Sequence, residues 1–311
     1  MELRQLESFL AVVEEGQFAR AASRLFLSPP AVTGHIRQLE REIGMPLLQR
    51  SPVMLTRAGE RLIPHARAIV GAAKAASDAV RDIRTEGSLP LRVGVMAPGS
   101  AELTPAVLRA FRQAQPQTRL TIESLGFTDY ITPLLEHRVD VAFVRPAPED
   151  ERIAAEVLTA EPRVIVAPAP SELADADGLR LADVLEVDYV RLPDSTPRGF
   201  VEYAYFAPAR NGMSPRLGLD QVRTAQDLLN SVATGQGIGA TLYSLSRFYR
   251  WPGVRCVPVI DAPWEESVLA TRRNDPRPEV QAFRALAVMI ARDLGPKLVP
   301  TPKLPTSEPG A

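Results

Sequence analysis

The stretch from Phe18 to Arg50 constrains this chain more than any other. Two short amphipathic patterns meet there at a Leu-Ser-Pro-Pro sequence, residues 27–30. The second pattern has apolar residues four, three and four positions apart, which is one face of an α-helix: Val32, Ile36, Leu39 and Ile43. Ser28 is placed to cap that helix, and Pro29 suits its first turn because the N–H that proline lacks has no helical partner there. The stretch predicts a short helix, a tight turn and a second helix.

The outer face of the second predicted helix is polar and basic. It carries Thr33, Gly34, Arg37, Gln38 and Arg41. Residues 20–67 contain eight arginines and three glutamates but neither lysine nor aspartate, whereas the whole chain has a formal net charge of −1. This pattern is typical of a helix-turn-helix, whose second helix enters the major groove of DNA. Positive charge on this motif suits contact with phosphates, although charge alone would indicate only a solvated surface.

These residues resemble the N-terminal domain of the LysR-type transcriptional regulators. The family's motif is matched by Ala21-Ala22, Ser28-Pro29-Pro30-Ala31, Ile36 with Leu39-Glu40, Ile43-Gly44, Leu47-Leu48-Gln49-Arg50 and Leu55-Thr56-Arg57-Ala58-Gly59. Two positions depart from the family's pattern, because Pro29 stands where glutamine is usual and Gly34 where arginine is frequent. Both face the bases in the family. The resemblance therefore implies DNA binding without implying a particular DNA site.

A change of hydrophobic period follows the helix-turn-helix. Residues 1–60 are expected to form a winged helix-turn-helix DNA-binding domain, with a hairpin wing between Leu47 and Leu55. Thr56 can cap the helix that follows the wing. Residues 61–88 are expected to form a linker helix with Pro64 in its first turn. A heptad seam runs along it through Leu62, Ala66, Ile69, Ala73, Ala76, Val80 and Ile83. The resemblance favours dimerisation through this seam, and a single helix packed on its own domain is the alternative.

Beyond residue 88, strand and helix patterns alternate. The order over residues 91–144 predicts parallel strands with right-handed crossovers, and the same alternation recurs over 164–259. It resembles the two-lobed, periplasmic-binding-protein-like (type II) effector domain of the family. We expect this domain at 89–300, with lobe I at 89–163 and 267–300, lobe II at 164–266, and a disordered tail at 301–311. The predicted fold class is α/β with an N-terminal all-α winged helix-turn-helix and a long linker helix.

Five residues are candidates for contact with DNA. In the family the N-terminal part of the recognition helix meets base edges, and the resemblance carries that role to Pro30, Thr33 and Gly34. Arg37 is expected to contact phosphate or base. Arg50 in the wing is expected to bind phosphate, since a guanidinium pairs well with it. The alternative for each position is an ordinary solvated residue.

Five further residues are candidates for contact with a small-molecule effector between the lobes. Ligands of open α/β sheets lie beyond the carboxyl ends of parallel strands. Ser100, Thr128 and Arg145 follow the three strands of lobe I, and Pro193 and Phe200 occupy comparable places in lobe II. Arg145 could pair with the carboxylate of an anionic effector or form an ordinary surface ion pair.

No catalytic or metal-binding constellation is recognisable. The three histidines, His35, His65 and His137, fall in three different predicted elements, and the single cysteine is Cys256. A glycine-rich stretch at 235–239 follows a helix and enters a strand, which is the reverse of the order that binds dinucleotides. We therefore expect no enzymatic activity, cofactor or metal. The lone cysteine and the lack of a long apolar run indicate a cytoplasmic protein without membrane contact.

These patterns predict a bacterial transcriptional regulator that binds double-stranded promoter DNA under the control of a small molecule. Self-association is expected through the linker helix as a dimer and, by resemblance, as a tetramer. RNA polymerase is a further candidate partner. Two alternatives stay open: a ligand-independent regulator, and a small-molecule-binding or enzymatic two-lobed protein whose N-terminal part only dimerises.

Overall fold

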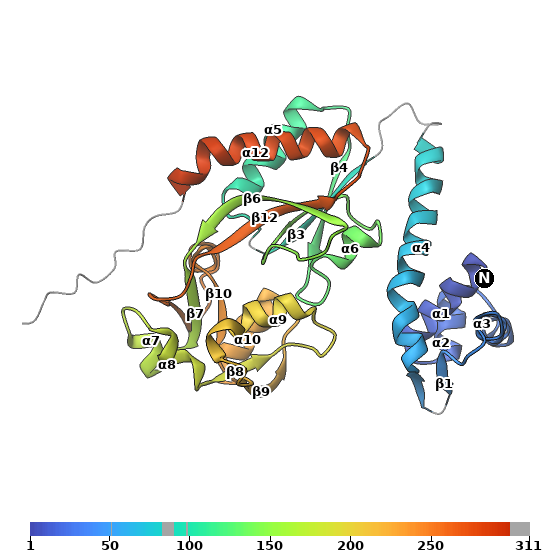
Figure 1. The fold of residues 1–311 in the computed structure, drawn as a ribbon, viewed down its shortest axis with the longest axis horizontal. Helices are drawn as coiled ribbons and strands as arrows, with labels where there is room; N and C mark the ends of the chain where they lie inside the picture. The colour runs from blue at the N-terminus through green and yellow to red at the C-terminus, as the bar shows by residue number, and fades with distance from the viewer. Residues whose placement is uncertain (51, 83–89, 98, 299–311) are drawn as a thin grey trace, which may run out of the picture. The chain divides into compact units, whose positions relative to one another are not determined.

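The computed structural model describes residues 1–50, 52–82, 90–97 and 99–298 of the 311-residue chain (Figure 1). The chain forms two compact units. The first comprises Met1–Leu89 with Leu135–Arg138, and the second comprises Pro90–Leu134 with Val139–Ala311. No helix in the described ranges has both the length and the apolar character needed to cross a membrane.

The first unit is a helix-turn-helix with a two-stranded wing and a long helix. Its elements are α1 (Leu3–Glu15), α2 (Phe18–Arg24), α3 (Pro29–Ile43), β1 (Leu48–Arg50), β2 (Val53–Leu55) and α4 (Arg57–Asp82). Strands β1 and β2 pair antiparallel, which confirms the predicted hairpin. The stripe of α3 packs into one apolar core with α1 and α2, where Val32, Ile36 and Leu39 have no exposed surface. Hydrophobic burial therefore leaves the opposite face of α3 toward solvent.

Helix α4 begins at the predicted Thr56 cap and therefore before residue 61, the expected start of the linker. The Thr56 hydroxyl accepts a hydrogen bond from the Gly59 N–H at 3.1 Å and so caps a helix whose first residue is Arg57. Pro64 consequently lies inside the helix and not in its first turn, so the prediction for this residue is wrong. On the predicted seam, Ala66 is buried in the first unit while Ile69 is 41% exposed. The Val80 side chain and residue Ile83 lie outside the described part of the chain.

The second unit is built on a five-stranded sheet of order β4-β3-β5-β12-β6. The strands are β3 (Leu91–Met96), β4 (Leu120–Leu125), β5 (Val141–Val144), β6 (Ile153–Glu161) and β12 (Glu265–Arg272). The first lobe's three predicted strands pair parallel, as expected, and β12 runs antiparallel to β5 and β6. Helices α5 (Leu103–Ala114) and α12 (Pro278–Leu298) lie side by side and share one apolar core with the sheet (Figure 1). The short helix α6 (Thr132–Leu135) precedes β5.

A second group of strands departs from the expected parallel order. Strand β7 (Arg163–Pro168) lies between β10 (Gly239–Leu242) and β11 (Val254–Pro258) and is antiparallel to both. Strands β10 and β11 run parallel to each other and are connected by α11 (Tyr243–Phe248). Strand β7 lies between them and runs in the opposite direction. Strands β8 (Asp188–Arg191) and β9 (Arg216–Gln221) pair parallel. The remaining helices are α7 (Glu172–Asp175), α8 (Leu181–Leu185), α9 (Arg198–Ala204), η1 (Ala207–Arg210) and α10 (Ala225–Ala233).

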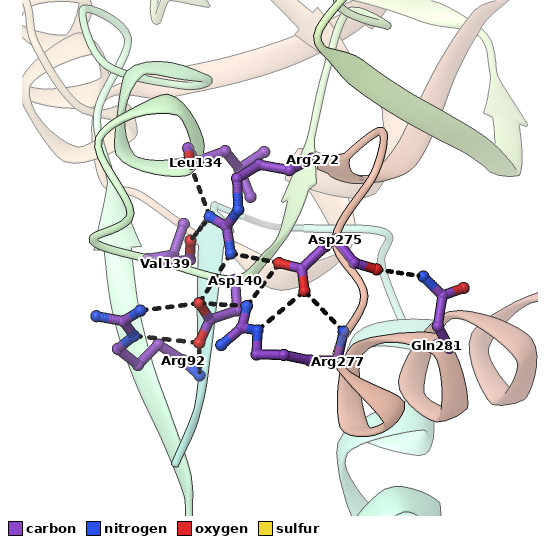
Figure 2. A network of polar contacts seen from close by, with 8 residues as sticks. All are labelled: Arg92, Leu134, Val139, Asp140, Arg272, Asp275, Arg277 and Gln281. Carbon is purple, nitrogen blue, oxygen red and sulfur yellow. Dashed lines mark hydrogen bonds and ion pairs between the residues drawn. The ribbon is translucent and has the colours of Figure 1, made fainter. Parts of the chain in front are cut away.

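A buried network of ion pairs connects α12 to the five-stranded sheet (Figure 2). The Asp140 carboxylate, which has no exposed surface, accepts hydrogen bonds from Arg92, Arg272 and Arg277 at 2.7–3.1 Å. Asp275 accepts from the same Arg272 and Arg277. Burial acts to raise the pKa of Asp140, but the hydrogen bonds from Arg92 and Arg277 outweigh it and hold that pKa well below its usual range. The network therefore joins β3, β12 and the start of α12 through charged groups.

Candidate DNA-binding and ligand-binding sites

The N-terminus of α3 is formed by the residues that the sequence singled out. Ser28 is the N-cap, and its hydroxyl accepts a long hydrogen bond from the Ala31 N–H at 3.4 Å. Pro29 follows as the first helical residue, and Gly44 ends the helix with φ of 82°. Both termini are thus closed by residues suited to those positions, and the N-terminal cap is the one that the sequence predicts.

Polar contacts hold α3 against its neighbours on the side away from solvent. The His35 ring and the Ser8 hydroxyl are 2.8 Å apart, which joins α3 to α1. The Glu40 carboxylate accepts hydrogen bonds from the backbone N–H groups of Leu47 and Leu48 at 2.9 and 3.2 Å. Glu40 therefore joins the recognition helix to the wing, so that these two elements present a fixed common surface.

The exposed surface of α3 carries most of the predicted DNA contacts. Pro30, Gly34 and Arg37 are exposed and Thr33 is half-buried. Arg37 forms no hydrogen bond or ion pair with a described residue, so its guanidinium is available to a partner. Neighbouring side chains restrain one another, since Arg41 donates to Gln38 and Gln38 donates to Glu42. Arg50 is the last residue of β1 and lies opposite Val53, but its side chain lies outside the described atoms.

In the second unit, two of the five predicted effector residues line one small cavity of about 40 Å³. These are Arg145, which follows β5, and Phe200 on α9. Other walls come from Met96, Ala97, Phe127, Leu192, Tyr203, Thr241 and Leu245. The lining draws on the segments that follow β3, β4 and β5 and on the part of the chain between β7 and β11. It is apolar apart from a few polar groups, as small-molecule sites commonly are.

The remaining three predicted effector residues do not belong to this lining. Ser100 is fully buried, and its hydroxyl accepts a hydrogen bond from Ser267, which also contacts Thr159 at 2.6 Å. Pro193 is buried and its carbonyl accepts from the Thr196 N–H, while Thr128 is half-buried. The hydroxyl of Ser100 thus joins the segment that follows β3 to β12 and, through Ser267, to β6.

Two aromatic residues outside the five predicted ones, Phe127 and Tyr203, join Phe200 in one wall of the cavity. The Phe127 and Phe200 rings stack with centroids 5.1 Å apart, and Tyr203 lies 5.6 Å from Phe200. Tyr203 follows Phe200 by three positions on α9, the spacing of one helix face. That spacing was visible in the sequence, whereas the approach of Phe127 from another element was not.

A second, larger cavity of about 710 Å³ also has Tyr203 in its lining. Its buried cation, Arg163, is already satisfied in large part: it donates to Glu265 at 3.2 Å and to the Tyr203 carbonyl at 2.9 Å. The guanidinium also lies between the rings of Tyr203 and Phe206, 4.1 and 4.2 Å from their centroids. Arg163 therefore serves the packing at the start of β7.

Groups of three or more side chains placed to hold a metal ion are absent from the described residues. Cys256 lies on β11 opposite Val166, where burial raises the pKa of its thiol to about 11. A thiol with so high a pKa is mostly protonated at neutral pH and is a poor nucleophile.

Comparison with known proteins assigns both units. Residues 3–60 match the model of the bacterial regulatory helix-turn-helix proteins of the lysR family, and residues 84–289 match the LysR substrate binding domain. The regulator CfxR of Cupriavidus necator is 27% identical, over 90% of this chain and 89% of the relative. The Hca operon transcriptional activator HcaR of Escherichia coli is 32% identical, over 78% and 81%.

A solved structure has the same fold along nearly the whole chain. Full-length CbnR, in complex with its target DNA, superposes with a TM-score of 0.63 at 24% identity and covers 94% of this chain and 100% of its own. The family models together cover both units, which agrees with the helix-turn-helix and the two groups of strands. The chain therefore belongs to the LysR family of transcriptional regulators and is a DNA-binding regulator with an effector-binding domain.

Proposed function

We propose that α3 and the wing bind promoter DNA through the residues that the sequence indicates. Pro30, Thr33 and Gly34 would meet base edges at the start of α3, with Arg37 on phosphate or base and Arg50 on phosphate. The observation that carries this proposal is the exposed Arg37, which pairs with no described residue and lies on a helix whose opposite face is fully buried. A rigid helix with a free cation is suited to insertion into a groove.

The domain organisation that we propose has residues 1–60 as the DNA-binding domain and 61–88 as a dimerising linker. Lobe I would comprise 89–163 and 267–300, and lobe II 164–266. Only Pro162 separates β6 from β7, which supports a crossing between lobes at that point. The exposed Ile69 on α4 supports dimerisation through the seam. A dimer would place two copies of α3 on one DNA site, and a tetramer and a contact with RNA polymerase are further parts of the proposal.

The effector, in this proposal, binds between the lobes and changes the arrangement of the DNA-bound assembly. Arg145 and Phe200 would contact it directly because they line the cavity. Ser100, Thr128 and Pro193 would position the surrounding loops or contact a ligand after the cavity opens. Binding that differs between two arrangements is what couples an effector to DNA.

Substitution of Arg37 tests the DNA-binding surface. Arg37→Ala removes one positive charge from α3, so we expect weaker binding on every duplex and a salt dependence reduced by about one unit of slope if Arg37 contacts phosphate. Loss of discrimination against altered bases would instead assign Arg37 to a base edge. Fluorescence anisotropy on a duplex selected from a random library measures both.

Arg109→Ala is the matched control, because Arg109 is an exposed arginine on α5 of the other unit. It should leave the affinity and its salt slope unchanged. Equal binding by the Arg37 and Arg109 variants would contradict the assignment of the outer face of α3 as the DNA-binding surface.

A further inference from the structure

Arg145 is a buried cation without a counter-ion in contact. Its side chain is 3% exposed, and Nη2 donates to the Gly99 carbonyl at 2.7 Å. Nε and Nη1 are also buried and have no hydrogen-bond partner, and Arg145 forms no ion pair with a described residue. Burial lowers the pKa of Arg145, yet a guanidinium stays protonated inside proteins. A buried charge with unused donors is costly unless an anion completes it.

The remaining walls of the cavity define what else the ligand must be. Of the described residues that line it, Arg145 is the single charged one, and Phe127, Phe200, Leu192 and Leu245 supply apolar surface. The Tyr203 hydroxyl, on a side chain more than nine-tenths buried, is a further group without a hydrogen-bond partner. One cation, one hydroxyl and apolar walls suit a compact molecule with a single anionic end.

We infer that the ligand of this cavity is a small monocarboxylate with an apolar body, whose carboxylate binds Arg145 and Tyr203. This inference rests on the proposed function only in taking that ligand to be the effector. A second carboxylate on the ligand would find no other cation in the lining, so dicarboxylates should bind less well. A neutral amide of the same shape would leave the guanidinium uncompensated.

Glu161 offers the rival explanation for the buried charge. It is 1% exposed, one of its oxygens accepts from the Ser244 N–H at 2.7 Å, and its other oxygen has no hydrogen-bond partner. Glu161 forms no hydrogen bond or ion pair with the guanidinium. Its negative charge favours the charged form of Arg145 from a distance but leaves Nε and Nη1 without a hydrogen-bond partner. If Glu161 alone balanced Arg145, carboxylates would gain nothing over amides.

The two cavities differ in ways that direct an anion to the smaller one. The larger cavity has four carboxylates in its lining, Glu149, Asp150, Glu202 and Glu265, against two arginines. The smaller cavity, at about 40 Å³, is far below the roughly 300–1,000 Å³ of a filled ligand site. Entry of the ligand therefore requires its walls to move apart. That movement links occupancy to the arrangement of the lobes.

Thermal unfolding of the full-length protein with matched pairs of small molecules tests the inference. The probes are pentanoate, cyclohexanecarboxylate and benzoate, each beside its amide, with terephthalate as the dicarboxylate. We expect at least one monocarboxylate to raise Tm saturably, by roughly 5–10 °C at a hundredfold excess over Kd, and its amide to leave Tm unchanged. Terephthalate should have the smaller effect of the acids.

Two arginine variants separate recognition from folding. Arg145→Gln should weaken binding of the active carboxylate at least about tenfold in calorimetry. Arg210→Gln is the matched control: Arg210 is also 3% exposed in this unit, donates to the carbonyls of Tyr205 and Leu185, and does not line the cavity. It should lower Tm and leave the carboxylate affinity intact. If Arg145→Gln fails to fold, the comparison of acids with amides on the wild type still decides.

The outcomes separate this inference from the proposed function. Acids that act no better than their amides, or that bind equally well to the Arg145 variant, overturn the inference even if the protein selects one DNA sequence. A carboxylate that binds through Arg145 supports it. If that protein then binds all duplexes alike, the proposed function fails and the ligand assignment stands.

Discussion

At the scale of single residues, two glycines of the first unit have opposite steric surroundings. A Cβ on Gly59 would lie 2.2 Å from the Leu47 carbonyl oxygen, whereas nothing lies within 4 Å of a Cβ on Gly34. Gly59→Ala should therefore lower the free energy of unfolding by about 1–3 kcal/mol, because α4 and the wing must separate. Gly34→Ala should leave it unchanged or raise it by up to about 1 kcal/mol, since alanine favours helix. Equal values in chemical denaturation would contradict this packing.

The Asp140 carboxylate should be among the most stabilising charged groups of the second unit. Asp140→Asn removes the buried negative charge that Arg92, Arg272 and Arg277 share. We therefore expect the free energy of unfolding to fall by about 3 kcal/mol. Asp150→Asn is the control, because Asp150 pairs with Arg152, whose side chain is 66% exposed. That change should cost under about 1 kcal/mol.

The same network predicts how stability depends on pH. The pKa values of Asp140 and Asp275 lie below normal because hydrogen bonds from arginine outweigh burial, so the folded state releases these protons more readily than the unfolded chain. The two carboxylates contribute fully to the free energy of unfolding above about pH 5. Their contribution declines as pH falls past the unfolded-state pKa of about 3.9 toward the folded-state pKa values. Urea titrations between pH 6 and 3 should show this decline, and Asp140→Asn should flatten it. An unchanged slope in the variant would refute the assignment.

The residues that line the small cavity show which parts of a site can be predicted from sequence. Arg145 and Phe200 could be proposed because each follows a recognisable strand or begins a helix. Tyr203 could have been found from its spacing to Phe200, and Phe127 directly precedes the predicted Thr128 after β4, but Leu245 reaches the cavity through tertiary folding. Such contacts depend on how distant elements pack and have no local signal in the sequence.

At the scale of elements, α4 carries the prediction for self-association. Ile69 is 41% exposed on the predicted seam, and Lys74 is exposed away from it. If the seam joins two chains, Ile69→Glu should raise the dimer dissociation constant at least about tenfold, since it places a charge in an apolar contact. Lys74→Glu should not. Analytical ultracentrifugation measures both, and an unaffected dimer in the Ile69 variant would locate the contact elsewhere.

Elements with a clear hydrophobic stripe or a run of β-branched residues can be predicted from the sequence. The stripe of α3 has one helical period, and β3, β4 and β5 are recognisable because each is rich in valine, isoleucine, leucine or phenylalanine. Strand β6 is not predicted because its three alanines and two glutamates have low strand propensity, so the segment lacks a clear strand signal in the sequence. The antiparallel order around β7 was also missed, since a β-α-β pattern does not reveal that another strand lies between its two strands. The expected place of Pro64 in the first turn is wrong because α4 begins at Arg57, directly after its Thr56 cap, which places Pro64 beyond that turn.

At the scale of the whole molecule, the chain combines a DNA-binding unit with an effector-binding unit, as in its family. Coupling between them requires that the effector favour one arrangement of the assembly over another. If the ligand of the small cavity is that effector, an active carboxylate should shift the DNA affinity or footprint of the wild type. The Arg145→Gln variant should bind DNA normally and show no such shift. A shift that persists in the variant would place the effector site elsewhere.

The central claim is that the chain binds a particular DNA sequence. A titration of the full-length protein on the DNA upstream of its own gene, at two salt concentrations and with competitor DNA, tests this most directly. The account predicts saturable binding that resists competitor and weakens as salt rises. Binding that is absent, or equal on all sequences, would contradict it and would make Pro29 and Gly34 the first residues to examine.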